Sequence, residues 1–477
     1  MAMRSEGGVP PRFDELLLAS LTGSGERAAI GPSAEWTGAQ LLARAGGAAA
    51  QLEAAGVTRG RPVIALLESS PRSMAYLVAG VLGDWPPAPL NPRAPLAELG
   101  PVAAALGASA VLSEPHVIEL AREVAAASGG VPVLQADDPP EVGRDWRGSA
   151  GEVAMVLHTS GTTGQARPVP QLMLPLAYRM AAYCQTSGIG RGDLFSGAAP
   201  FHHISGAGMA LVALGAGAGV ASVPRFTMDS WQWVREVRPS HVLVVPSMIE
   251  MLLAAGELDA GMKTLIYGAS PIRPETLIGM LKVLPETELV QIFGQTEVSP
   301  VTALTHEDHL AAAGGRPELL RSVGRPVPGV ELRIENPDER GVGEVAMRGR
   351  HAMRSAADGW HRLGDLGRIS DGLLYLAGRK GDMIIRGGEN IHPLEIERVL
   401  AGHPAVAEVV VTAAPDRRLG EVPLAVIVPT DPAAPPDPGE LRAFAKERLA
   451  GFKVPVLWRF AEALPRNSAG KVLRRML

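Results

Sequence analysis

The sequence has very little of several features that define other kinds of protein. Cys184 is the single cysteine in 477 residues, so an intramolecular disulfide and a cysteine-based metal cluster are excluded. No uncharged apolar run approaches the roughly 18 residues that a membrane-spanning helix needs. The formal net charge of −5 offers no basic footprint for nucleic acid or an anionic membrane. The first residues lack a basic segment followed by an apolar one, so we expect no secretory signal and a cytoplasmic location.

The composition favours a soluble protein with more than one domain, since a typical domain holds roughly 100–200 residues. Apolar segments alternate with segments of helical spacing, and this alternation predicts parallel sheets covered by helices on both faces. Ligands of such sheets bind beyond the carboxyl ends of the strands. The expected helices are 37–55 and 71–82, and the expected strands are 62–67, 108–112, 194–198, 241–245, 263–267 and 289–293.

The last third of the chain changes in character. Strand patterns separated by glycine-rich turns predict a barrel-like β subdomain at 330–335, 343–348 and 373–377. A mixed pattern follows residue 379 and predicts a small α+β domain. Its expected strands are 382–386, 406–413 and 425–428, and its expected helices are 393–400 and 440–449. The glycines of 215–219 are spaced like a dinucleotide-binding loop but precede a strand, so we expect a tight turn there.

A segment of threonine, serine and glycine follows the apolar strand expected at 153–157. Glycine permits a positive φ, and the hydroxyls add donors, so the segment is typical of a flexible cradle for phosphate oxygens. It lacks the lysine pattern of a Walker A loop. Considered alone, it also fits an ordinary surface loop. Its residues are Thr159, Ser160, Gly161, Thr162, Thr163 and Gly164.

Two carboxylates stand where nucleotide chemistry can use them. Thr296 and Glu297 follow the strand expected at 289–293, where a hydroxyl suits a phosphate oxygen and a carboxylate suits Mg²⁺. Asp365 follows a glycine turn, and its two oxygens suit the vicinal hydroxyls of a ribose. Considered singly, Glu297 also fits a solvated loop and Asp365 a turn-forming residue. Lys471, next to the C-terminus, by itself fits a solvated tail.

In order and spacing, these segments resemble the core motifs of the class I adenylate-forming superfamily, which includes acyl-CoA synthetases, nonribosomal peptide adenylation domains and luciferases. The resemblance covers nearly the whole chain and favours the acyl-CoA ligase branch. It implies an α/β fold with a large N-terminal domain, 1–379, built from two doubly wound α/β subdomains and a distorted β-barrel, and a small mobile α+β domain, 380–477. The matching segments are 88–92, 159–164, 293–297, 343–344, 359–365, 378–396, 452–455 and 465–471.

The resemblance implies a reaction in two steps. A carboxylate attacks the α-phosphate of ATP to give acyl-AMP and pyrophosphate, and a thiol then takes the acyl group and releases AMP. Thr159 to Gly164 would cradle the β- and γ-phosphates, Thr296 would contact the α-phosphate, and Glu297 would hold Mg²⁺. Lys471 would stabilise the charge that builds on phosphorus during adenylation. The implied adenine neighbours are Gly268, Ala269, Ser270, Gln291, Ile292, Phe293 and Gly294, and the implied ribose ligands are Asp365 and Arg379.

The resemblance also bears on the acid. His203 matches the position where CoA ligases carry a histidine beside the acyl carboxylate, and His202, Gly208 and Gly294 are expected to border the same substrate. No aspartate follows, which disfavours an amino acid. The small residues at 205–208 favour a bulky acid, aryl or polycyclic. A metal site made by His202 and His203 is not expected, because neighbouring side chains diverge.

The sequence departs from the family pattern at three informative positions. Arg167 replaces the usual lysine after the phosphate segment, which keeps the charge and changes its geometry. Leu363 replaces a threonine. Gly381 occupies the hinge position, where aspartate or lysine is common; glycine permits rotation but adds no side-chain contact.

The expected ligands are ATP, Mg²⁺ and CoA, with CoA as acceptor. A carrier protein or a partner enzyme as acceptor stays open, as does the oligomeric state, for which a homodimer is one arrangement. Two alternative functions stay open. One is a luciferase-like oxygenation, which uses the same motifs, and the other is a non-catalytic nucleotide-binding paralogue. The presence of Glu297, Asp365, Arg379 and Lys471 favours an enzyme.

Overall fold

The computed structural model describes residues 11–160, 166–259, 261–269, 272–353, 356–387, 389–466 and 472–477. The chain divides into two compact units. The N-terminal unit comprises Met1–Glu331 and Arg348–Gly359, and the C-terminal unit comprises Leu332–Met347 and Trp360–Leu477. Most of the strands expected in a barrel of the large domain therefore group with the C-terminal unit. The predicted domain boundary at residue 379 stays a prediction.

A nine-stranded sheet is the largest element of the N-terminal unit, with the order β15-β14-β13-β12-β11-β9-β10-β1-β2. The run from β13 to β1 is parallel throughout, and the strands at both ends are antiparallel to their neighbours. The bounds are β1 Arg27–Gly31, β2 Ala34–Thr37, β9 Leu194–Gly197, β10 Gly219–Ala221, β11 His241–Val244, β12 Thr264–Gly268, β13 Glu288–Phe293, β14 Thr302–Leu304 and β15 Arg325–Pro326.

A second, parallel sheet of the same unit has the order β4-β3-β5-β6. All residues of β3 and β5 are buried, as continuous apolar runs in parallel sheets require. The predictions of parallel α/β sheets and of these strands are confirmed, with shifts of the ends by one or two residues. The bounds are β3 Val63–Leu66, β4 Pro87–Pro89, β5 Ala110–Ser113 and β6 Val133–Gln135.

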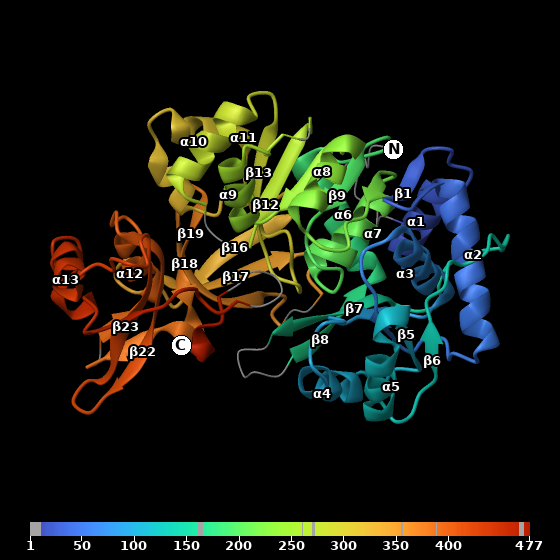
Figure 1. The fold of residues 1–477 in the computed structure, drawn as a ribbon, viewed down its shortest axis with the longest axis horizontal. Helices are drawn as coiled ribbons and strands as arrows, with labels where there is room; N and C mark the ends of the chain where they lie inside the picture. Colours follow the sequence, from blue (N-terminus) through green and yellow to red (C-terminus); the bar gives the residue numbers. More distant parts are fainter. Residues whose placement is uncertain are drawn as a thin grey trace. The chain divides into compact units, whose positions relative to one another are not determined.

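Helices of the N-terminal unit surround these sheets (Figure 1). The predicted helix at 37–55 is confirmed as α2. Its start is fixed by Thr37 and Gln40, which form a reciprocal capping box with N···O distances of 3.3 and 3.0 Å. The helices are α1 Phe13–Leu21, α2 Gly38–Ala54, α3 Pro71–Gly83, α4 Leu96–Leu106, α5 Ile118–Ala127, α6 Met173–Ser187, α7 Met209–Gly215, α8 Met228–Val237, α9 Pro246–Ala255, α10 Pro274–Val283 and α11 His306–Ala313.

The strand before the phosphate segment does not belong to a parallel sheet. β7 (Val153–Ser160) pairs antiparallel with β8 (Ala166–Leu172) as a two-stranded ribbon. The strand expected at 153–157 is confirmed and extends to Ser160. At 215–219 the tight turn is confirmed, since α7 ends at Gly215, Gly217 has φ +84°, and β10 begins at Gly219.

The C-terminal unit holds two sheets. One has the order β16-β17-β18-β19 and, among the described residues, forms a four-stranded sheet instead of the expected barrel; β18 includes Asp365, which the sequence placed after a turn. The other has the order β21-β20-β23-β22, with β24 beside β23. The bounds are β16 Val330–Glu335, β17 Gly343–Gly349, β18 His361–Ser370, β19 Leu373–Arg379, β20 Ile384–Arg386, β21 Glu389–Ile391, β22 Val406–Asp416, β23 Gly420–Pro429, β24 Leu457–Phe460, α12 Pro393–Leu400 and α13 Pro438–Lys446.

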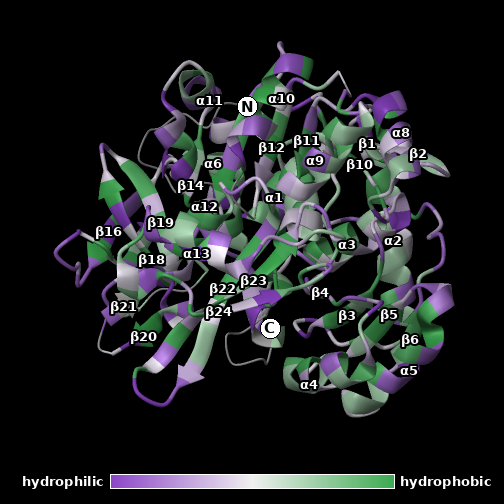
Figure 2. Cartoon of the chain, turned by 60° about the vertical axis from the view of Figure 1, so that its left-hand side comes forward, coloured by the Kyte–Doolittle hydropathy of each residue, from purple (hydrophilic) through white to green (hydrophobic). Residues whose placement is uncertain are grey.

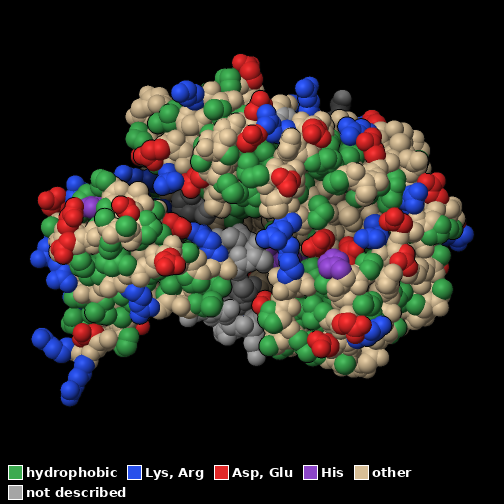
Figure 3. All heavy atoms as spheres, viewed as in Figure 1, with side chains coloured by type: hydrophobic (Ala, Val, Ile, Leu, Met, Phe, Trp, Pro, Cys, Tyr) green, Lys and Arg blue, Asp and Glu red, His purple; other side chains and the backbone are tan. Residues whose placement is uncertain are grey.

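Hydropathy follows this layering, with hydrophobic residues concentrated on the sheets and the inner sides of helices (Figure 2). Acidic and basic side chains are interspersed over the face seen in Figure 3. In the part of the chain that the structure describes, none of the helices has both the length and the apolar character that crossing a bilayer requires.

Candidate active site

Some of the residues predicted to bind nucleotide and acid lie at one edge of the nine-stranded sheet, in the segments that follow β9, β12 and β13. β9, β11, β12 and β13 are parallel, so their carboxyl ends meet at this edge. Gly268 pairs in register with Ile292, which places the ends of β12 and β13 side by side. His202 and His203 follow β9, and Thr296 and Glu297 follow β13. The carboxyl edge is where parallel α/β sheets bind ligands.

Glycines permit close backbone approaches at this edge. A Cβ on Gly268 would lie 2.3 Å from the carbonyl oxygen of Ile292, and one on Gly294 would lie 2.8 Å from Ser299. Ala269 has φ +71°, a left-handed conformation that costs energy for any residue with a Cβ. Ser270 lies outside the described residues. The segment after β12 is therefore sterically constrained where the sequence predicts contact with adenine.

Polar atoms near this edge lack partners. Gln291 is 4% exposed, and its side-chain Oε1 is buried without a hydrogen bond. The carboxylate of Glu297 makes no hydrogen bond or ion pair with any described residue, and Glu297 is half-buried. One carboxylate without a partner fits Mg²⁺, which takes one or two protein carboxylates and completes its shell with phosphate and water oxygens. No group of three or more metal-ligating side chains occurs elsewhere in the described chain.

The two adjacent histidines lie together, with ring centroids 4.3 Å apart. The expectation that their side chains diverge is wrong, because they occupy a turn before a helix and not a strand. Burial holds the pKa of His203 at about 4. Burial, with the positive charges of His203, Arg93 and His158, holds the pKa of His202 at about 3. Both rings are therefore neutral at pH 7.

The helix that follows begins with a π-helical turn, Ile204–Gly208, in which the Met209 N–H bonds back to the Ile204 carbonyl. Such turns often mark functional sites. Its small residues do not leave open space. A Cβ on Gly206 would lie 2.1 Å from the Pro200 carbonyl oxygen, and one on Gly208 would lie 2.6 Å from Ile204 Cδ1. Packing of the turn explains these glycines, and the inference of a bulky acid from them is not supported.

The predicted phosphate segment is described only at its start. Thr159 lies on β7, directly across the ribbon from Arg167. This pairing places the backbone of Arg167, which replaces the usual lysine, beside the start of the segment. The side chain of Ser160, and all of Gly161, Thr162, Thr163 and Gly164, lie outside the described residues.

His158, which precedes this segment, was not singled out by the sequence. Both ring nitrogens are buried and have no partner, and burial holds its pKa at about 4. Arg179, Gln171 and His351 were missed as well; they contact the backbone around Thr296 and Glu297. A fully buried arginine within an amphipathic helix leaves no signal in composition or spacing.

The C-terminal unit brings the two predicted ribose ligands together. Asp365 and Arg379 face each other in register on β18 and β19, with Arg379 Nε 2.7 Å from Asp365 Oδ1. Asp365 is 4% exposed, so the guanidinium orients a buried carboxylate. Gly381 lies just beyond β19 in the short 3₁₀ helix Lys380–Asp382, and a Cβ there would meet no atom within 4 Å. Lys471 lies outside the described residues.

Comparison with known proteins assigns the family. Residues 19–355 match the AMP-binding enzymes, and residues 395–471 match the AMP-binding enzyme C-terminal domain. The chain is 31% identical to the indoleacetate–CoA ligase of Aromatoleum aromaticum over 92% of each chain. It is 33% identical to the fatty acid–[acyl-carrier-protein] ligase ScoC of Streptomyces coeruleorubidus over 67% of this chain and 66% of that protein.

A solved structure with the same architecture is the o-succinylbenzoate–CoA synthetase of Bacillus subtilis in complex with ATP and magnesium ion. Its TM-score is 0.84 at 27% identity, and the match covers 98% of this chain and 99% of that one. The match to the family spans most of the chain, in both units. The protein is therefore an adenylate-forming enzyme that belongs to the family of AMP-binding enzymes.

Proposed function

We propose that this enzyme activates an aryl carboxylic acid with ATP and Mg²⁺ and transfers the acyl group to CoA. The observation that carries the proposal is the partner-free carboxylate of Glu297, placed beside Thr296 at the carboxyl edge of a parallel sheet. Mg²⁺ at Glu297 would neutralise charge on the phosphates of ATP. Thr296 would donate its hydroxyl to the α-phosphate, and Asp365, held by Arg379, would accept from the ribose hydroxyls.

The neutral histidines suit the acid. An uncharged imidazole N–H at His203 can donate a hydrogen bond to the substrate carboxylate without forming an ion pair with it. The carboxylate then keeps its negative charge and its nucleophilicity while it is oriented toward phosphorus. The low pKa values of His202 and His203 keep both rings in this form at neutral pH.

The relatives support the class of acid and the acceptor. The indoleacetate–CoA ligase and the o-succinylbenzoate–CoA synthetase carry names that specify aryl acids and CoA. A carrier protein is the second candidate acceptor, since the relative ScoC is named as an acyl-carrier-protein ligase. For the two half-reactions we propose a large domain, 1–379, and a mobile domain, 380–477, with Gly381 as hinge and Lys471 as the cation of the adenylation step.

Acid-dependent ATP–pyrophosphate exchange across a panel of aryl, polycyclic and fatty acids tests the first step. Exchange with aryl acids, reduced at least about thirtyfold in Lys471→Ala by the scale of single oxyanion donors, is expected. Thioester formation with CoA, and not with a phosphopantetheinylated carrier protein, is expected for the second step. Exchange with fatty acids only would reject the acid class, and absence of exchange with every acid would reject the function.

A further inference from the structure

Arg179 is a fully buried arginine near the middle of α6, and neither the sequence motifs nor the proposed chemistry gives it a role. Its side chain is among the largest in the protein with no exposed surface. Buried arginines are rare and are normally paired with carboxylates. Among the described residues, Arg179 has no carboxylate within ion-pair distance.

The guanidinium instead binds the backbone of the segment that carries Thr296 and Glu297. Arg179 Nη2 donates to the carbonyl oxygen of Thr296 at 3.1 Å, and Nη1 donates to Gln171 Oε1. Gln171 Nε2 lies 3.4 Å from the same carbonyl. Nε is buried without a partner. Two side chains therefore hold one carbonyl, and one of them carries a full charge.

The rest of the segment is held in the same way, by its carbonyl groups. The Glu297 carbonyl accepts from Met353 N–H at 2.9 Å. His351 Nε2 donates to the carbonyls of Val298 and Pro300, at 3.2 and 2.8 Å. In contrast, the Glu297 carboxylate and the N–H groups of Thr296 and Glu297 have no partner in the described chain. The described chain thus binds the carbonyl groups of this segment and leaves the N–H groups of Thr296 and Glu297, with the Glu297 carboxylate, for a ligand.

The charge of Arg179 is only partly compensated. Burial lowers its pKa to about 10, and the negative charge of Glu297 opposes that shift. A buried cation without a counter-ion costs stability. A charged donor on the Thr296 carbonyl also polarises the peptide group that ends in the Glu297 N–H, which makes that N–H a better donor. Both effects favour an anion next to this segment.

We propose that Arg179 is a positioning residue for MgATP: it fixes the Thr296–Glu297 peptide from behind and holds a buried positive charge that Glu297 compensates in part and the bound nucleotide compensates further. The inference rests on the proposed function, because the phosphates of ATP are the anion. It predicts that the bare enzyme carries Arg179 at a cost in stability and recovers that cost when MgATP binds.

Arg179→Met and Arg179→Lys, measured in the acid-dependent exchange, test this. Arg179→Met is expected to raise KM for MgATP at least about tenfold with little change in KM for the acid. Its melting temperature without ligand should equal or exceed that of wild type, and the increase caused by MgATP should fall by more than half. Arg179→Lys keeps the charge but loses the planar guanidinium, whose two Nη atoms bind Gln171 and the Thr296 carbonyl. We therefore expect a KM for MgATP close to wild type and a several-fold lower kcat.

Tyr183→Phe is the matched control, since it removes a 2.8 Å hydrogen bond to Ser299 in the same segment without removing a charge. It should change KM for MgATP less than threefold. A merely structural role is indicated if Arg179→Met lowers the melting temperature and leaves KM for MgATP unchanged, or, where that variant does not fold, if Arg179→Lys lowers the melting temperature and leaves both kcat and KM for MgATP unchanged. Wild-type enzyme without exchange would reject the proposed function; wild-type exchange with unaltered Arg179 variants would reject only this inference.

Discussion

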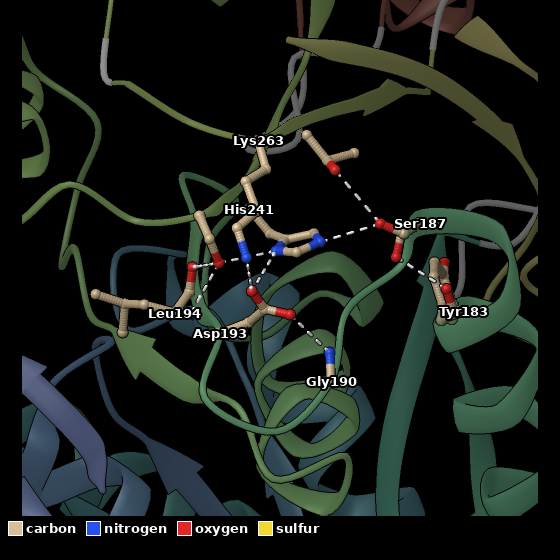
Figure 4. A network of polar contacts seen from close by, with 9 residues as sticks. Tyr183, Ser187, Gly190, Asp193, Leu194, His241 and Lys263 are labelled. Carbon is tan, nitrogen blue, oxygen red and sulfur yellow. Dashed lines mark hydrogen bonds and ion pairs between the residues drawn. The ribbon is translucent and has the colours of Figure 1, made fainter. Parts of the chain in front are cut away.

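The two ends of the strands in the N-terminal unit treat their buried polar groups in opposite ways. At the amino ends of β9, β11 and β12, the histidine and the aspartate drawn in Figure 4 are paired: His241 Nε2 donates to the Ser187 carbonyl at 3.0 Å, and its Nδ1 lies 2.9 Å from Ser240 Oγ. Asp193 accepts from Lys263 Nζ and from Gly190 N–H, both at 3.0 Å. On the side of the carboxyl ends, His158, Gln291 and Glu297 have polar atoms without partners.

This difference in hydrogen bonding distinguishes groups that stabilise the fold from groups that are available to a ligand. An unpaired buried polar group costs about 1–3 kcal/mol, so a protein retains one only where a ligand supplies the missing partner or another role requires it. The paired groups around His241 have no such vacancy and stabilise the loop between α6 and β9. The comparison therefore predicts that substitutions at one end change stability and that substitutions at the other end change activity.

The largest effect is expected from Glu297→Gln. The amide keeps the shape of the side chain and removes the charge that Mg²⁺ requires, so the exchange rate should fall at least about a hundredfold. Because the carboxylate makes no hydrogen bond or ion pair with the described residues, the urea midpoint should stay unchanged. An equal loss of stability and activity would contradict the comparison. Exchange rates at several Mg²⁺ concentrations and urea unfolding measure both quantities.

The opposite result is expected at the paired end. His241→Leu leaves the Ser187 carbonyl and the Ser240 hydroxyl without their histidine partner, so the free energy of unfolding should drop by about 2 kcal/mol. The exchange kinetics of the folded fraction should remain within twofold of wild type. A raised KM for ATP or acid in this variant would show that the two ends are coupled.

A smaller and inverse effect is expected from His158→Phe. The substitution replaces two unpaired buried nitrogens by apolar atoms, so it should raise the free energy of unfolding by about 1 kcal/mol at pH 8. If the nitrogens bind a ligand, KM for the acid or for ATP should increase several-fold. A higher free energy of unfolding with unchanged KM values would show that His158 does not bind a ligand. A lower free energy of unfolding would show that its ring nitrogens have partners.

The free energy of unfolding of His158→Phe should also depend less on pH than that of the wild-type protein. The pKa of His158 is about 4 in the folded protein and near its ordinary value when unfolded, so only the unfolded state takes up the proton between these values. The free energy of unfolding is therefore unaffected by this titration above pH 6.5 and decreases as the pH falls toward 4, because the unfolded state then binds the proton. The free energy of unfolding of His158→Phe should therefore fall less steeply with decreasing pH over this range. The difference in slope corresponds to at most one proton bound on unfolding. Equal slopes in the two proteins would place the pKa of His158 near 6.5.

Much of the fold follows from the sequence because its signals are local. The apolar runs of β3, β5, β9, β11, β12 and β13 stand between helices, and their lengths suit buried parallel strands. Other elements lack such signals. β8 contains Pro168 and Pro170, which argue against a strand and are tolerated because the ribbon has only one partner strand. β18 contains Gly364 and Gly367, so its pattern suggests turns.

The candidate site is predictable where chemistry fixes residue types and not where packing does. Glu297, Asp365 and Arg379 belong to motifs, and the structure places them on or just after strands. The supporting contacts of Arg179, Gln171 and His351 bind carbonyl groups, which every residue has, so no pattern of side chains reveals them. The contact between the His202 and His203 rings depends on a turn geometry that alternation rules do not cover.

The π-helical turn at Ile204–Gly208 has a consequence for how the binding site can change in evolution or by engineering. Removing one residue from such a turn restores ordinary α-helical winding and rotates everything before it by about 100° relative to α7. His202 and His203 stand immediately before the turn, so a single deletion would redirect both rings at once. Chain length at this turn, rather than side-chain identity, is therefore an accessible variable for redirecting the two histidine rings that are proposed to border the acid.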